Sequence, residues 1–223
     1  MRFLILPVGH RQCQDGLVTQ ARPYGGVDGA ARLARRRAGL LDAGLELLGG
    51  DADPAELTVR GICRQAGVAT RYFYESFTDK DEFVGAVFDW VVAGLAATTQ
   101  AAVAAAPPAE QNRAGIANMV RTVEQDPRVG RLLFSAQLSN STVVGKRQEL
   151  GPLFAILSGQ HVETTLNRPA NERIKAFAHF VVGGVGQTIS AWLAGDVGLS
   201  AAELVDQISA MIDELGKPRI FRN

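Results

Sequence analysis

The chain has no excess of charge of either sign and very little cysteine. Its 223 residues contain 23 Lys and Arg and 23 Asp and Glu, so the formal net charge is zero. Any nucleic-acid binding must therefore come from a local basic surface rather than from the charge of the whole protein. The two cysteines, Cys13 and Cys63, lie far apart in the sequence. They predict a reduced, unpaired state in the cytoplasm, because a disulfide-stabilised small fold needs more bridges.

Residues that bind metals or perform covalent catalysis are also scarce. The three histidines are His10, His161 and His179, and they share no ligand spacing with the cysteines. We therefore expect no metal. His161 and Glu163 are two residues apart, so they do not face each other on a helix and form no acid–base pair. The GGVG stretch at residues 183–186 lacks the order of a phosphate-binding loop and favours close packing of two helices instead. We expect no cofactor and no enzymatic activity.

The sequence lacks an alternating strand pattern longer than a few residues, and its apolar residues recur at steps of three and four, as in helices. An apolar stripe predicts a first helix at about residues 31–48; it consists of Leu33, Leu40, Leu41, Leu45 and Leu48. Further helices are expected at about 80–106, 110–124, 127–136, 146–166, 170–194 and 201–215. Gly151 and Pro152 predict a kink or boundary, and Ser200 is a good N-cap for the last helix.

The first 30 residues differ from the rest. The apolar run at residues 3–8 is interrupted by Pro7 and is too short for a membrane helix. Glycines mark a flexible stretch after it. We expect residues 1–30 to be a disordered tail; an arm that touches DNA or a partner is the alternative. Four arginines follow at the start of the first helix: Arg32, Arg35, Arg36 and Arg37. They predict either phosphate contacts or a solvated helix start.

Residues 58–83 organise the chain, because they have the pattern of a helix, a turn and a second helix. Thr58 is a plausible N-cap, and Gly67 stands where a left-handed residue would end the first helix. Val68 is apolar and can fill the gap between the two helices. Phe73 and Phe77 are four residues apart, so both point inward and turn Thr70, Arg71, Tyr72 and Glu75 outward. This is the helix-turn-helix arrangement of DNA-binding proteins.

The stretch Ala66-Gly67-Val68, followed by Phe73-Tyr74, Phe77 and Lys80, resembles the signature of TetR-family transcriptional regulators. The resemblance runs without a gap from about residue 35 to about residue 90. Two bulky residues, Arg71 and Tyr72, stand where the family often has small ones. The resemblance implies a homodimer, a palindromic operator, a small apolar or amphipathic effector, and repression more often than activation.

Base readout is predicted for the outward residues of the second helix. Arg71 can bind guanine through two hydrogen bonds, and Tyr72 can contact a thymine methyl or a phosphate. The resemblance implies that Arg60 touches a base or the backbone, and that Tyr74 and Lys80 contact phosphates. Glu75 would repel phosphate unless it accepts from a cytosine amine or pairs with a nearby arginine. The predicted DNA-binding residues are Arg60, Thr70, Arg71, Tyr72, Tyr74 and Lys80.

Two further surfaces are predicted in the remainder of the chain. Polar or aromatic residues within apolar helical stretches are candidates for an effector pocket, with satisfied core residues as the alternative; they are Trp90, Asn118, Gln137, His161 and Gln187. Apolar stripes on the last two helices predict a four-helix dimer interface. Its candidate residues are Val181, Val185, Ile189, Trp192, Leu204, Ile208 and Met211.

The sequence therefore predicts an all-α protein, with a helix-turn-helix module at residues 31–78 and a helical regulatory and dimerisation domain at residues 79–217. We expect a cytoplasmic, ligand-responsive regulator that binds double-stranded operator DNA as a homodimer and has no membrane partner. Two alternatives stay open. One is a helix-turn-helix regulator that needs no ligand, and the other is a helical enzyme or carrier that binds a small molecule.

Overall fold

The computed structural model describes residues 29–51, 57–166 and 171–217, with only the backbone for residues 153 and 157–166. This part of the chain is helical and contains no strand, which confirms the predicted fold class. The predictions for residues 1–28, with His10 and Cys13, lie outside the described residues. The helices are α1 (Gly29–Gly49), α2 (Val59–Gln65), α3 (Thr70–Tyr74), α4 (Lys80–Ala105), the 3-10 helix η2 (Pro108–Glu110), α5 (Gln111–Gln125), α6 (Pro127–Phe134), α7 (Ser141–Leu166), α8 (Glu172–Leu193) and α9 (Ala201–Leu215).

Side-chain caps fix where most of these helices begin. Thr58 accepts a hydrogen bond from the Gly61 amide before α2, and Asp79 accepts from Glu82 before α4. Asp126 and Asn171 cap α6 and α8 in the same way. Ser200 forms a capping box with Glu203 at the start of α9, which confirms its predicted role. These caps satisfy amides that have no partner within the helix.

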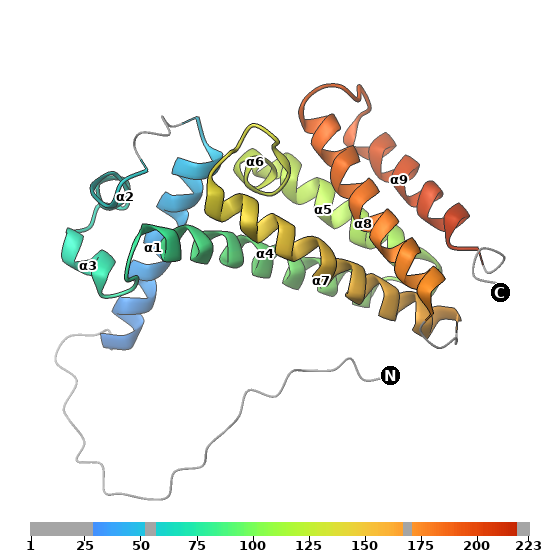
Figure 1. Ribbon diagram of the computed structural model, residues 1–223, viewed down its shortest axis with the longest axis horizontal. Helices are drawn as coiled ribbons and strands as arrows, with labels where there is room; N and C mark the ends of the chain where they lie inside the picture. The colour runs from blue at the N-terminus through green and yellow to red at the C-terminus, as the bar shows by residue number, and fades with distance from the viewer. Residues whose placement is uncertain (1–28, 52–56, 167–170, 218–223) are drawn as a thin grey trace, which may run out of the picture.

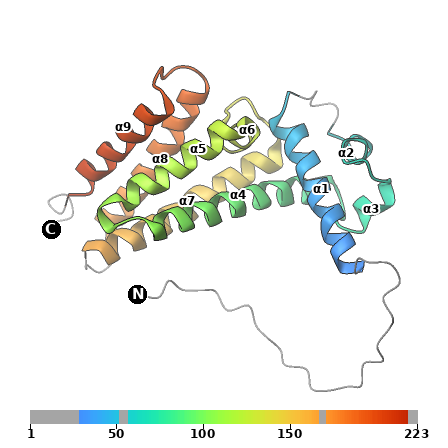
Figure 2. The same ribbon diagram turned by 180° about the vertical axis from the view of Figure 1, so that it is seen from behind.

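The helices form an elongated molecule with α1, α2 and α3 at one end and α8 and α9 at the other (Figure 1). The long helices α4 and α7 run between the two ends. Seen from behind, α9 lies along α5, and α1 crosses the beginning of α4 (Figure 2). The helix-turn-helix segment is therefore exposed at one tip, far from the last two helices.

One hydrophobic cluster joins the helix-turn-helix to the helices that follow it. It contains Phe73 and Phe77 from the α3 region, Phe83 from α4 and Leu132 from α6. The cluster therefore crosses residue 79, where the sequence predicts a domain boundary, and the domain division remains a prediction. Gly44 allows α1 to approach α4 closely, since a Cβ there would lie 2.5 Å from Val87.

A second cluster lies at the other end of the molecule and joins α5, α8 and α9. Its buried members are Ile116, Val120, Ile189, Leu204, Val205 and Ile208. The Trp192 indole donates to the Leu199 carbonyl at 2.8 Å and fastens the loop between α8 and α9. The last two helices are thus built around α5 within a single chain.

Three details correct or narrow the predictions. Leu33 is 42% exposed, because α1 extends past the core over its first three turns. No boundary occurs at Gly151 and Pro152, since α7 runs through both residues. Among the described residues, nothing lies within 4 Å of a Cβ built at Gly183, Gly184 or Gly186, so these glycines make no close approach to another described helix there.

By length and composition alone, α4 and α8 are apolar enough to cross a membrane. This is weak evidence, because core helices of soluble proteins pass the same test. The apolar residues of α4 include Phe83, Val84, Val87 and Phe88, which are buried in the first cluster. Packing against the rest of the chain therefore explains the apolar residues in the first half of α4, whereas only 17% of its most apolar 18-residue window is buried.

Candidate nucleic-acid interface

The turn between α2 and α3 has the geometry that its residues predict. Thr58 Oγ1 accepts from the Gly61 amide at 3.0 Å, so α2 starts where expected. Gly67 has a φ of +65°, the left-handed conformation that glycine adopts at little cost. The Val68 amide then donates to the Cys63 carbonyl at 3.0 Å, and the Val68 side chain packs against the first cluster. The turn thereby sets the angle between the two helices.

Aromatic packing fixes the inner face of α3. Phe73 and Phe77 are 0% and 2% exposed, as predicted, and the Phe73 ring centre lies 5.4 Å from that of Phe83. The Arg37 guanidinium lies over the Phe77 ring at 4.4 Å from its centre. Since α3 has only five residues and no side-chain cap, these contacts hold it in place rather than its own hydrogen bonds.

The outer face of α3 is polar and faces solvent. Thr70, Arg71 and Tyr74 are exposed, with Tyr74 at 59%, and Tyr72 is half-buried. Arg60 on α2 and Lys80 at the first position of α4 are also exposed. All six predicted DNA-binding residues thus lie on α2, on α3 or at the start of α4, at the same tip of the molecule (Figure 1).

An arginine from α1 joins this surface. Arg36 Nη1 lies 3.7 Å from Glu75 Oε2, so Glu75 pairs with an arginine. The Arg36 guanidinium also lies over the Tyr72 ring at 4.0 Å from its centre. On the same ring, Arg71 Nη2 donates to the Tyr72 hydroxyl at 2.6 Å. This hydrogen bond is the main reason why the pKa of Tyr72 falls below its ordinary value.

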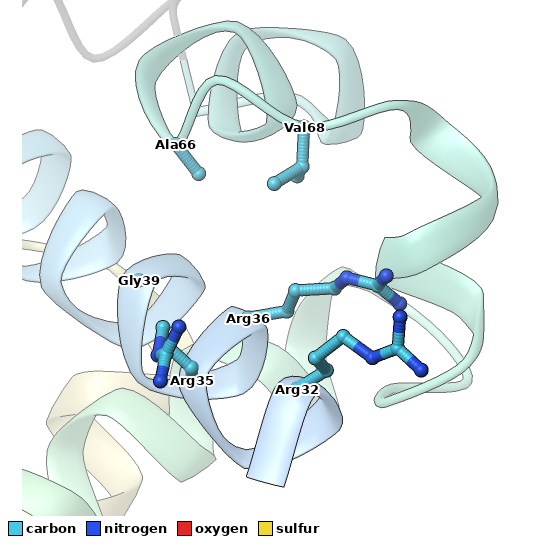
Figure 3. A pocket seen from close by; sticks show the side chains of 6 residues that line it. All are labelled: Arg32, Arg35, Arg36, Gly39, Ala66 and Val68. Carbon is cyan, nitrogen blue, oxygen red and sulfur yellow. The ribbon is translucent and has the colours of Figure 1, made fainter. Parts of the chain in front are cut away.

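A hollow of about 320 Å³ lies between α1 and the turn after α2 (Figure 3). Its lining consists of Arg32, Arg35, Arg36, Gly39, Ala66 and Val68. Arg36 is paired with Glu75, and the positive charges of Arg32 and Arg35 at the rim favour anions such as phosphate groups. The sequence indicated the arginines but not the hollow, because the hollow depends on how α1 crosses the turn.

Comparisons with known proteins agree with this geometry. Residues 40–87 match the sequence model described as bacterial regulatory proteins of the tetR family. The matched segment contains α2, the turn and α3 in full. This segment belongs to the tetR family. Among curated proteins, no significant match was found.

Solved structures of TetR-family and related regulators share the fold over most of the chain. A TetR-family regulator from Syntrophomonas wolfei has 13% identity and a TM-score of 0.68, covering 82% of this chain and 95% of its own. A transcriptional regulator from Pseudomonas aeruginosa PAO1 has 17% identity and a TM-score of 0.67, with coverages of 87% and 99%. FadR from Bacillus subtilis, solved with stearoyl-CoA, has 15% identity and a TM-score of 0.61, with coverages of 78% and 96%.

In the described part of the chain, the predicted effector-pocket residues form no hydrogen bonds with one another. Trp90 is 40% exposed, and Gln137 and Gln187 are exposed. Asn118 is buried, and its amide donates to Thr98 and Thr99 at 3.0 Å each. The side chain of His161 lies outside the described residues. Asn118 is therefore already satisfied within the core.

The predicted dimer residues divide into two groups. Ile189, Leu204 and Ile208 are at most 3% exposed and belong to the second cluster within one chain. They lie beneath the surface of the last helices, which corrects their assignment to the interface itself. Met211 is 50% exposed, while Val181, Val185 and Trp192 are half-buried. An apolar stripe in the sequence did not distinguish the side facing α5 from the side facing solvent.

Proposed function

We propose that the protein is a ligand-responsive transcriptional repressor that binds a palindromic operator as a homodimer. The observation that supports this most directly is the outer face of α3, where Thr70, Arg71 and Tyr72 project at one tip of the molecule beside a TetR-family turn. Helices placed in this way enter the major groove with their N-terminal residues on base edges. Residues 31–78 act as the DNA-binding module, and residues 79–217 as the regulatory and dimerisation domain.

Different residues are candidates for the contacts to bases and for the contacts to phosphates. Arg71 is the candidate for paired hydrogen bonds to guanine, and Tyr72 is positioned beside it. Tyr74, the last residue of α3, and Lys80, the first residue of α4, are exposed, so they are suited to phosphates. Arg60 on α2 lies on the same tip and supports either type of contact.

The open face of α8 supports a dimer through the last two helices. Phe180 is 65% exposed, and the adjoining Gly183 and Gly184 have open space around them. Exposed apolar side chains together with small residues allow a second helix to approach closely. Met211 adds an exposed apolar side chain on α9. The interface is formed by this outer layer, over the core that Ile189 and Ile208 build within each chain.

The dimer is tested at Phe180. Because this side chain faces solvent in one chain, Phe180→Glu should leave each protomer folded yet prevent association by burying unpaired carboxylates. We expect the wild type to sediment as a dimer at micromolar concentration and the variant as a monomer with an unchanged helical circular dichroism spectrum. Gln125→Glu, at an exposed site on α5, is the matched control and should remain dimeric. A monomeric wild type would contradict the proposal.

Effector binding is proposed in the regulatory domain, and α6 is the route from there to the DNA-binding module. Arg147 on α7 donates to carbonyls at the end of α6. On the other side of α6, Arg128 Nη1 lies 3.0 Å from Glu46 Oε2 on α1, and Arg131 donates to the Gly49 carbonyl. A ligand that favours one position of α7 can therefore change the position of α1 and α3 through α6. In linkage terms, the effector and the operator would then favour different conformations of the dimer.

An amphipathic acyl thioester is the first effector class to test, since the FadR structure of the same fold contains stearoyl-CoA. We expect stearoyl-CoA to raise the melting temperature and to weaken operator binding. Arg128→Met should keep the thermal shift but reduce the loss of operator affinity, because the link to α1 is cut. The control is Arg113→Met, which breaks an ion pair between α5 and α9 instead. Absence of a thermal shift with any candidate effector would favour a ligand-independent regulator.

DNA binding itself is tested by selecting fragments from random DNA with the purified protein. We expect an inverted repeat whose half-sites lie on successive turns of one face of the duplex. Recovery of no preferred sequence would contradict the proposed function.

A further inference from the structure

Arg36 differs from the other arginines at the start of α1. It is half-buried, whereas Arg32, Arg35 and Arg37 are exposed. Figure 3 shows the side chains of Arg32 and Arg36 extending toward the same side, while Arg35 turns away from them. Of the three arginines that line the hollow, only Arg36 has a described ion pair. The sequence grouped all four as equivalent candidates for phosphate contacts.

The partners of Arg36 are Tyr72, which lies in α3, and Glu75, which directly follows α3. Its guanidinium lies 4.0 Å from the ring centre of Tyr72 and 3.7 Å from the Glu75 carboxylate. A guanidinium over an aromatic face is attracted by the ring, and the planar group can stack on it. The carboxylate compensates the positive charge. Arg36 is therefore engaged within the protein and is poorly placed to act as a free charge for a phosphate.

Tyr72, which Arg36 holds in place, is in turn in contact with Arg71. The Tyr72 hydroxyl accepts from Arg71 Nη2 at 2.6 Å, and the Arg71 guanidinium lies 4.6 Å from the Tyr72 ring centre. A free arginine side chain on a surface samples many rotamers, and this freedom is lost on binding a base. A side chain already held near its bound arrangement loses less, so it discriminates bases better.

We propose that Arg36 is a positioning residue for base readout: it holds Tyr72, and through Tyr72 the Arg71 guanidinium, in the arrangement that recognises a base pair. This rests on the proposed function, in which the outer face of α3 reads DNA. The role is one of sequence specificity, distinct from the phosphate contacts that set the general affinity. It also explains how Glu75 is tolerated near DNA, since its charge is paired with Arg36.

The experiment compares Arg36→Met with Arg35→Met, which removes the same charge from the adjacent position. Each full-length variant is titrated against the operator selected by the wild type and against scrambled DNA, over a series of salt concentrations. For Arg36→Met we expect the ratio of operator to scrambled affinity to fall roughly tenfold, with an unchanged salt slope. For Arg35→Met we expect an unchanged ratio; if Arg35 touches phosphate, the salt slope falls by about one per half-site.

A double-mutant comparison tests the route through Tyr72. In a Tyr72→Ala background, Arg36→Met should cause no further loss of specificity, because the ring that it holds is absent. Tyr72→Phe keeps the ring but not the hydroxyl, so it should lose specificity while Arg36 retains its stacking partner. Additive effects of Arg36→Met and Tyr72→Ala would overturn the proposal.

Two other outcomes are decisive. If Arg36→Met weakens binding to all DNA equally and reduces the salt slope, Arg36 is a phosphate contact and the proposal is wrong. If Arg36→Met does not fold, Arg36→Lys keeps the charge but not the planar group, and unchanged specificity in that variant would also overturn the proposal. Failure of the wild type to select any sequence would instead refute the proposed DNA-binding function and is recognised before any variant is made.

Discussion

Arg147 provides the sharpest test of how the regulatory domain is held together. Its Nε donates to the Leu132 carbonyl at 2.9 Å, and its other nitrogens donate to the Ser135 and Arg131 carbonyls at 2.7 and 2.9 Å. These acceptors lie at the end of α6, where the last carbonyls lack the amides of a following turn. The Arg131 carbonyl also accepts from the Ser135 amide at 3.2 Å. Among the described contacts of Arg147 there is no carboxylate, and desolvation lowers the pKa of its guanidinium. The guanidinium thus serves as a C-cap supplied by another helix.

The loss of stability expected when Arg147 is replaced follows from these three carbonyl acceptors. A hydrogen bond to a charged group contributes about 1.5–3 kcal/mol when buried. Arg147 is half-buried, so water replaces part of what is lost, and the desolvation of its charge offsets another part. We therefore expect Arg147→Met to lower the free energy of unfolding by about 2–4 kcal/mol, well below the full sum. The free energy of unfolding of Arg147→Lys should lie between those of the wild type and Arg147→Met, since an ammonium keeps the charge but lacks the planar fork of the guanidinium.

The assay is urea denaturation followed by circular dichroism, at equal protein concentration because a dimer's stability depends on concentration. Arg173→Met, at an exposed position on α8, is the matched control and should change stability by less than about 0.5 kcal/mol. If Arg147→Met is as stable as this control, the carbonyl contacts do not stabilise α6 and the reasoning fails.

Four further substitutions test caps, a turn and a helix interior. Hydrogen bonds from Arg128 lower the pKa of Asp126, so its contribution is complete above its unfolded pKa of about 3.9 and is lost as the pH falls through the lower folded pKa. The melting-temperature difference between wild type and Asp126→Asn should accordingly be greatest above about pH 5 and shrink below about pH 4; a constant difference would contradict this. Gly67→Ala should lower the free energy of unfolding by about 1 kcal/mol in urea denaturation, because the backbone of Gly67 is left-handed. Gly145→Ala, within α7, should instead raise the free energy of unfolding by about 0.5–1 kcal/mol, because the added methyl group meets nothing within 4 Å. Thr58→Ala should cost about 1 kcal/mol in the same assay through the lost cap of α2, and an unchanged stability would show that water replaces the hydroxyl.

Local features of the fold could be predicted because they depend on neighbouring residues. The cap at Thr58, the left-handed Gly67 and the inward pair Phe73 and Phe77 all follow from spacings of a few residues, and the structure confirms them. Leu33 continues the apolar stripe of α1 and is nevertheless exposed. The stripe does not show where the neighbouring helices end, and α1 extends beyond them.

Contacts between distant residues could not be predicted. Arg36 and Tyr72 meet because α1 crosses α3, and Arg147 reaches α6 because the chain folds back after Ser135. Likewise, an apolar helix does not reveal which of its faces lies against its own chain. Ile208 is therefore in the core, whereas Phe180, which is not among the predicted interface residues, is exposed.

If the outer face of α3 reads bases, replacing Arg71 must change the DNA sequence that the protein selects. The operator is first selected from random DNA with the wild type, and the selection is then repeated with Arg71→Ala and with Lys80→Ala. We predict that Arg71→Ala loses the preference at one base pair in each half-site, with a ten- to hundred-fold weaker affinity for the operator. Lys80→Ala should keep the sequence preference and reduce the salt dependence of binding. If Arg71→Ala selects the same sequence and binds it as tightly as the wild type, α3 does not read DNA through this face.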